Sequence, residues 1–116
     1  MWIFTPKGFI SAVAHRDRPG HLLVRARRAE HLRALFPDAG VQCTPRADYR
    51  FRAVVTREQF LGRMLGAMSG IDYDNFKATI PDAEYHDAAT EVWQVMHKIQ
   101  PGSNPFKSSL SPYNDY

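Results

Sequence analysis

The sequence predicts an α+β fold, with an antiparallel sheet of about four strands in the first half packed against helices, a helical second half and a C-terminal tail. Up to about residue 56, and apart from a short helical segment, the chain has an apolar run and stretches of alternating apolar and polar side chains that are typical of strands, and beyond it apolar residues recur with the period of a helix. A chain of 116 residues with 44% hydrophobic and 12% aromatic residues has enough apolar side chains for one core. We therefore expect a single domain over residues 1–100.

Four segments have the pattern of strands: residues 9–15, 22–27, 41–44 and 49–55. Asp17-Arg18-Pro19-Gly20 is a strong turn sequence, so the first two segments are expected to form a hairpin. A short helix at 29–36 separates the second segment from the third. In the fourth segment, the face expected to lie in the core carries Tyr49, Phe51, Ala53 and Val55.

The order of these elements limits the topology. Residues 22–69 follow the order strand, helix, strand, strand, helix, which is that of ferredoxin-like folds without their final strand. The strand at 9–15 is a candidate to take the place of that missing strand. We expect the helices to cover one face of the sheet.

The first helix of the second half is expected to begin after Thr56, and Gln59 completes a capping box with it. Gly70 is its expected end. Gly62 and Gly66 lie one turn apart within it, and each costs about 1 kcal/mol relative to alanine in a helix. We therefore expect a neighbouring element to pack closely against these two glycines.

Two further helices are expected. A short one begins at Ile71 and must end before Pro81, and Asp82 then caps the third, which runs to about Gln100. Residues 101–116 have no hydrophobic period and few apolar groups, so we predict an extended or flexible tail there. This tail would lie against its own domain or against a neighbouring copy.

Charge is distributed unevenly along the chain. Residues 1–63 carry a net charge of +7, from Lys7 and eleven arginines against five acids, whereas residues 64–116 carry −4. If the two long strands belong to one sheet, their arginines share a face and form a patch for an anion or a partner. The candidate residues are Arg25, Arg27, Arg50 and Arg52 on that face, with Arg16, Arg18 and Arg46 at its turn edges.

The sequence has no motif that predicts catalysis. His86-Asp87 resembles a metal-binding pair, but adjacent helical residues point about 100° apart, and a histidine packed beside Trp93 is the better interpretation. Asp72, Asp74, Asp82 and Glu84 could in principle hold Mg²⁺ for phosphodiester cleavage. However, Asp72 and Asp82 occupy expected helix N-caps, where the helix dipole alone favours a carboxylate. Nucleophile elbows and Gly-rich phosphate loops are absent. We therefore expect no catalytic residue, no metal site and no cofactor.

The chain is expected to be soluble and cytoplasmic, with no membrane partner. No apolar run approaches the ~20 residues of a membrane span, and the first residues lack the pattern of a secretion signal. Cys43 is the single cysteine, so it cannot form an internal disulfide, and we predict that it is a small buried apolar residue.

Five motifs combine aromatic, acidic and basic residues: Trp2-Ile3-Phe4-Thr5-Pro6-Lys7-Gly8-Phe9, Leu23-Val24-Arg25-Ala26-Arg27, Asp48-Tyr49-Arg50-Phe51-Arg52, Asp72-Tyr73-Asp74-Asn75-Phe76-Lys77, and Tyr85-His86 with Val92-Trp93. In these motifs the chain resembles a family of small uncharacterised proteins of bacteria and actinobacterial phages. The likeness covers residues 2–100. That family has no assigned activity, so the resemblance implies a cytoplasmic, bacterial or phage-encoded protein and nothing about mechanism.

We expect a small binding protein, namely a protein-interaction or self-associating module whose partner is another protein or a second copy of the chain. The alternative is nucleic-acid binding through the arginine-rich face, to which Trp2, Tyr49 and Tyr73 would add base stacking if exposed. No zinc-finger, basic-zipper or RNA-recognition motif is present. A further alternative is that these arginines pair with the acidic helices of the same molecule or of a partner copy, in which case the face is a solvated strand face that binds no ligand.

Overall fold

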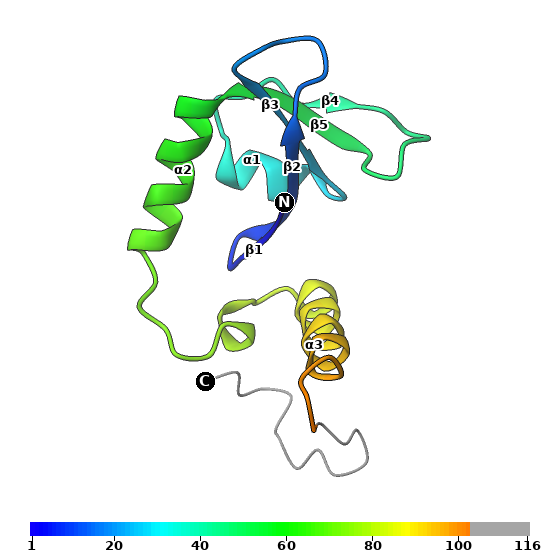
Figure 1. The fold of residues 1–116 in the computed structure, drawn as a ribbon, viewed down its shortest axis with the longest axis vertical. Coiled ribbons are helices and arrows are strands. Elements are labelled where there is room, and N and C mark those ends of the chain that lie inside the picture. The colour runs from blue at the N-terminus through cyan, green and yellow to red at the C-terminus, as the bar shows by residue number, and fades with distance from the viewer. Residues whose placement is uncertain (103–116) are drawn as a thin grey trace. The chain divides into compact units, whose positions relative to one another are not determined.

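The structure, a computed structural model that describes residues 1–102, has a sheet in its first half and helices after it, which confirms the predicted fold class (Figure 1). The chain divides into two compact units, Met1–Ile71 and Asp72–Tyr116. The predicted tail lies outside the described residues, apart from Pro101 and Gly102. The elements are β1 (Trp2–Thr5), β2 (Gly8–Ala14), β3 (His21–Ala26), α1 (Ala29–Leu35), β4 (Gln42–Cys43), β5 (Phe51–Thr56), α2 (Arg57–Ser69), the 3-10 helix η1 (Lys77–Thr79) and α3 (Ala83–His97).

The first unit contains a five-stranded sheet in the order β1-β2-β3-β5-β4, with every neighbouring pair antiparallel. β1 is a strand beyond the four predicted, and it forms a hairpin with β2. In the turn between them, Thr5 Oγ1 accepts hydrogen bonds from the N–H groups of Lys7 and Gly8, at 3.1 and 3.2 Å. A Cβ at Gly8 would lie 2.5 Å from His31 Cγ, so glycine allows α1 to approach β2 closely.

The core of the first unit lies between one face of the sheet and the helices α1 and α2. Ile10 on β2 and Val24 on β3 point into it, together with Leu32 from α1. Phe36, just after α1, and Phe60 on α2 stack with ring centroids 5.9 Å apart. A helix as short as α1 is marginal alone, so its stability depends on this packing.

The position of β2 agrees with the role predicted for the strand at 9–15. β2 pairs with β3, which is the first strand of the strand-helix-strand-strand-helix order over residues 22–69. It therefore takes the place of the final strand of a ferredoxin-like sheet, although it precedes the other elements in the chain. Both α1 and α2 contribute to the core, which leaves the opposite face of the sheet without a helix from this unit.

Two residues lie differently from their predictions. Tyr49 does not share the core face with Ala53, because β5 begins at Phe51 and bends at residues 47–49 interrupt the alternation before it. Its ring instead contacts side chains of the opposite sheet face. The prediction that Cys43 is buried is also wrong, because it lies exposed on the two-residue edge strand β4, which has a neighbouring strand on one side only.

α2 has the predicted termini. Thr56 Oγ1 accepts a hydrogen bond from the Gln59 N–H at 3.1 Å, and Gln59 Oε1 accepts one from the Thr56 N–H at 2.8 Å, so the capping box is confirmed. The helix ends at Gly70, as expected. The close packing predicted at Gly62 and Gly66 is wrong, because a Cβ at either position would meet no atom within 4 Å.

The described part of the second unit contains η1 and α3. Asp82 caps α3 as predicted, and its Oδ1 accepts a hydrogen bond from the Tyr85 N–H at 2.8 Å. The short helix predicted from Ile71 is wrong in extent, because only the single turn Lys77–Thr79 forms before Pro81 and a longer nucleus is costly without packing. Within residues 1–102, no helix combines the length and the apolar character needed to cross a membrane.

Candidate functional site

The sheet face turned away from α1, here called the distal face, carries the predicted strand arginines. Strand pairing places one row across all five strands, formed by Trp2, Ser11, Arg25, Arg52 and Gln42. Arg25 and Arg52 are direct cross-strand partners, an arrangement in which like charges repel. Different neighbours hold the two guanidinium groups.

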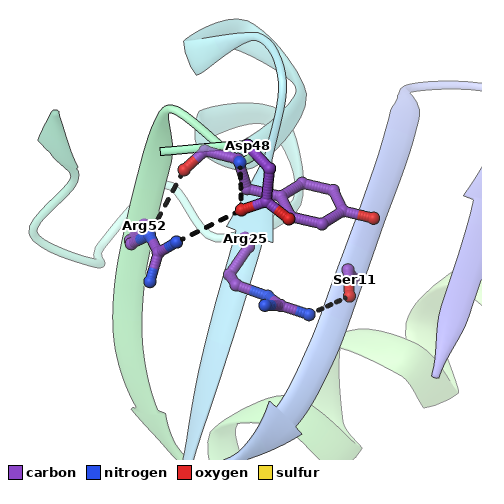
Figure 2. Close-up of polar contacts among 5 residues, drawn as sticks. Ser11, Arg25, Asp48 and Arg52 are labelled. Carbon is purple, nitrogen blue, oxygen red and sulfur yellow. Dashed lines mark hydrogen bonds and ion pairs between the residues drawn. The ribbon is translucent and has the colours of Figure 1, made fainter. Parts of the chain in front are cut away.

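Arg25 is held on the β2 side of the row. Its Nη2 donates a 2.8 Å hydrogen bond to Ser11 Oγ, and Ser11 is 1% exposed (Figure 2). Its guanidinium carbon also lies 4.7 Å from the centroid of the Tyr49 ring. The Arg25 Nε is buried and has no hydrogen-bond partner within the described residues, and the attraction between guanidinium and ring offsets part of that cost.

Arg52 is held by the segment that precedes β5. Its Nε donates a 3.2 Å hydrogen bond to the Tyr49 carbonyl oxygen, and its Nη2 lies 3.6 Å from Asp48 Oδ1 (Figure 2). The same Asp48 oxygen accepts the Tyr49 N–H at 2.8 Å. Asp48 and Arg52 thus fix the backbone that carries the Tyr49 ring.

Tyr49 is the centre of these contacts. The guanidinium carbons of Arg25 and Arg27 lie 4.7 and 4.6 Å from its ring centroid, and the Phe9 ring lies 6.4 Å away. We call Tyr49, Arg25 and Arg27 the Tyr49 cluster. Because Tyr49 is 5% exposed, its ring supports the distal face and is not available as a stacking surface for a ligand.

The other predicted arginines lie at two different ends of the sheet. Arg50 precedes β5 and Arg46 lies in the loop between β4 and β5, so both are exposed at the end that carries the Tyr49 cluster. Arg16 and Arg18 are exposed in the turn between β2 and β3, at the opposite end of β3. The structure therefore brings five of the seven arginines to one end and leaves Arg16 and Arg18 apart.

An aromatic group lies on the β1 and β2 side of the distal face. Trp2 is 71% exposed and its ring meets that of Phe9 edge-on, with centroids 6.3 Å apart, while Phe4 stacks on Phe9 at 4.5 Å. This group was missed because β1 was not predicted. The signal that could have identified it is the short apolar run Trp2-Ile3-Phe4 followed by a turn at Pro6 and Lys7, which is weak because so short a run has little period of its own.

α2 provides a second candidate surface. Leu61, Leu65 and Met68 follow one side of the helix and are 65, 66 and 67% exposed; we call these three residues the α2 stripe. At the Leu61 end the stripe borders a mostly apolar hollow of about 350 Å³ at the base of the helix. The walls of this hollow include Val13 on β2 and Leu22 on β3.

The second unit contributes ring contacts. Trp93 stacks on His97 with centroids 5.8 Å apart, and the buried Lys77 amine lies 4.9 Å from the centroid of the Trp93 ring. His86 Nδ1 lies 3.6 Å from Asp87 Oδ1 on the same helix. Within residues 1–102, no three His, Cys, Asp or Glu side chains are grouped as metal ligands.

No family model, curated protein or solved structure matches this chain. The distal face and the α2 stripe are therefore the basis on which a function is proposed. The distal face combines arginines with aromatic rings, and the α2 stripe combines exposed apolar side chains with a hollow.

Proposed function

We propose that this protein is a self-associating protein-interaction module of the cytoplasm, in which two copies meet through the α2 stripe and the hollow beside it. The observation that carries the proposal is a row of three large apolar side chains, each about two-thirds exposed. Such a row favours association, because a second apolar surface removes it from water. Anchors at positions i, i+4 and i+7 of an exposed helix are a common form of protein contact.

A second copy of the chain suits the α2 stripe because the two ends of the stripe have complementary shapes. The Leu61 end borders the hollow, whereas Met68 and Ile71 at the other end are 67 and 57% exposed. In an antiparallel pair of α2 helices with a two-fold axis near Leu65, Met68 of each copy lies about 4.5 Å along the helix from the axis, beside Leu61 of the other copy. That distance brings it close to the hollow of the other copy.

The expected dimer is weak. A contact of three side chains and one hollow on each copy buries less than the roughly 1,200 Å² that stable specific interfaces need. Its population should therefore depend strongly on protein concentration. Gly62 and Gly66, which have open space around them, add room for the second helix to approach.

Sedimentation velocity over a series of protein concentrations tests this proposal. The wild-type chain should shift from monomer to dimer as concentration rises, and Leu65→Gln should stay monomeric over the same range. Val95→Gln is the matched control, because Val95 is 57% exposed on α3 and undergoes the same kind of change. A wild-type chain that stays monomeric throughout, or a dimer that Val95→Gln disrupts and Leu65→Gln does not, contradicts the proposal.

The cytoplasmic location in this proposal is supported by Cys43. Its thiol is exposed and free, and it is the single cysteine of the chain. Disulfides are rare and thiols stay reduced in the cytosol, so an exposed free thiol is compatible with that compartment.

A further inference from the structure

We propose that the distal face binds single-stranded nucleic acid, with bases stacking on Trp2 and phosphates contacting Arg27 and Arg50. This site uses none of the residues of the α2 stripe and does not depend on self-association. Three features of the face support it: an exposed tryptophan, exposed arginines two to three strands away, and ring contacts that hold Trp2 and Arg27 in place.

Trp2 provides the stacking surface. It is 71% exposed, and β1 holds its backbone through pairing with Ser11 and through the 2.9 Å hydrogen bond from the Ala12 N–H to the Met1 carbonyl oxygen. Phe9 contacts the Trp2 ring edge-on at 6.3 Å. A ring held in this way loses little freedom when a base stacks on it, so more of the stacking energy contributes to affinity.

The arginines of the distal face divide into two kinds. Arg25 and Arg52 are hydrogen-bonded within the first unit, and their charges are partly covered. Arg27 and Arg50 are exposed, and neither is paired with an acidic side chain among residues 1–102. The Arg27 guanidinium carbon lies 4.6 Å from the Tyr49 ring centroid, which keeps this charge next to the sheet. Phosphate groups are the natural partners of such guanidinium groups.

The spacing of these groups suits a short strand that crosses the sheet. β1 carries Trp2, β3 leads directly into Arg27, and Arg50 directly precedes β5. Neighbouring strands lie about 4.8 Å apart, so the arginines are about 10–14 Å from the β1 edge. That span accommodates a few nucleotides, with a base at the aromatic end and phosphates at the arginine end.

Single-stranded nucleic acid fits the distal face better than the other anionic partners. A duplex keeps its bases stacked on one another, so it would contact the arginines and leave Trp2 unused. An acidic peptide would likewise pair with Arg27 and Arg50 but has no regular series of flat rings for the indole. The combination of an exposed indole with exposed guanidinium groups selects a ligand that has both bases and phosphates.

Fluorescence anisotropy with labelled oligothymidylate and oligouridylate, titrated with the full chain at low and at physiological salt, tests the site. Trp2→Ala should weaken binding about tenfold, the effect of losing one stacked base. Arg27→Gln and Arg50→Gln should each lower the slope of log affinity against log salt by about 0.7. Arg16→Gln in the turn at the opposite end of β3 is the matched control and should leave that slope unchanged.

Four results would overturn the proposal, provided that the melting temperatures show all variants to be folded. These are no saturable binding at low salt, unchanged affinity of Trp2→Ala, an equal loss from Arg16→Gln and Arg27→Gln, and displacement of the oligonucleotide by polyglutamate as readily as by unlabelled oligonucleotide. The last result would assign the face to an acidic protein. Leu65→Gln should bind the oligonucleotides like the wild-type chain, so failure of the dimer and failure of this site are distinguishable.

Discussion

Replacement of Tyr49 by leucine tests whether the distal face is built around the tyrosine ring. Tyr49 is 5% exposed, and the guanidinium carbons of Arg25 and Arg27 lie 4.7 and 4.6 Å from its ring centroid. Leucine keeps an apolar side chain at this position and removes both cation–π contacts. Each contact contributes about 0.5–1 kcal/mol when exposed and about 2 kcal/mol when desolvated. We therefore expect the free energy of unfolding to fall by about 1–3 kcal/mol.

A double-mutant cycle isolates the part of this loss that involves Arg25. Arg25→Met removes the cation–π contact, which lowers the free energy of unfolding. It also removes the buried Nε that has no hydrogen-bond partner within the described residues, which raises the free energy of unfolding, so the single variant reports only the sum of the two effects. Combining it with Tyr49→Leu cancels these separate effects and should leave a coupling energy of about 1 kcal/mol. Arg16→Gln is the control and should change stability by less than about 0.5 kcal/mol.

Urea denaturation followed by far-UV circular dichroism measures these differences. The m-values of the variants should agree, because the same surface is exposed on unfolding in each case. A coupling energy indistinguishable from zero would refute the stacking of Arg25 on Tyr49. Unchanged stability of Tyr49→Leu would show that the ring does not support the face.

Other substitutions test the packing of glycines and a helix cap. Gly8→Ala should destabilise the first unit by about 1–3 kcal/mol, because the new Cβ would lie 2.5 Å from His31 Cγ. Gly40→Ala is the control and should be neutral or slightly stabilising, because its Cβ would meet nothing within 4 Å. Thermal melts compare the two variants, and equal changes in melting temperature would contradict the close approach of α1 to Gly8. Gly66→Ala should raise stability by up to about 1 kcal/mol, since its Cβ enters open space on a helix, and a lower melting temperature would show that another element packs there. Asp82→Ala should cost about 1 kcal/mol and speed amide exchange in the first turn of α3, and unchanged exchange would rule out the cap.

The elements that sequence reasoning predicted correctly are those whose signal is local. β3 and β5 follow from alternation and β2 from an apolar run that ends at a turn, while the starts of α2 and α3 follow from Thr56 and Asp82, because such patterns and caps depend on a few neighbouring residues. β1 was missed because a strand of four residues shows little period of its own, and its pairing with β2 is what makes it a strand.

The candidate site was predicted in part. Alternation placed Arg25 and Arg52 on one sheet face, and the strand pairing confirms this. It could not show that Tyr49 lies against Arg25, or that Asp48 holds Arg52, because both contacts depend on bends that precede β5. The exposed Trp2 became part of the site only once β1 was known to pair with β2.

By itself, the sequence determined the secondary-structure periods, the helix caps and the uneven division of charge, because each of these depends on residue types at short spacing. The tertiary structure decided which arginines are engaged and which are exposed, that Gly62 meets open space, and that Leu65 remains in contact with water. These outcomes depend on the order β1-β2-β3-β5-β4 and on where α1 and α2 pack. Each of these outcomes requires contacts between residues far apart in the chain, and a local sequence pattern carries no information about such contacts.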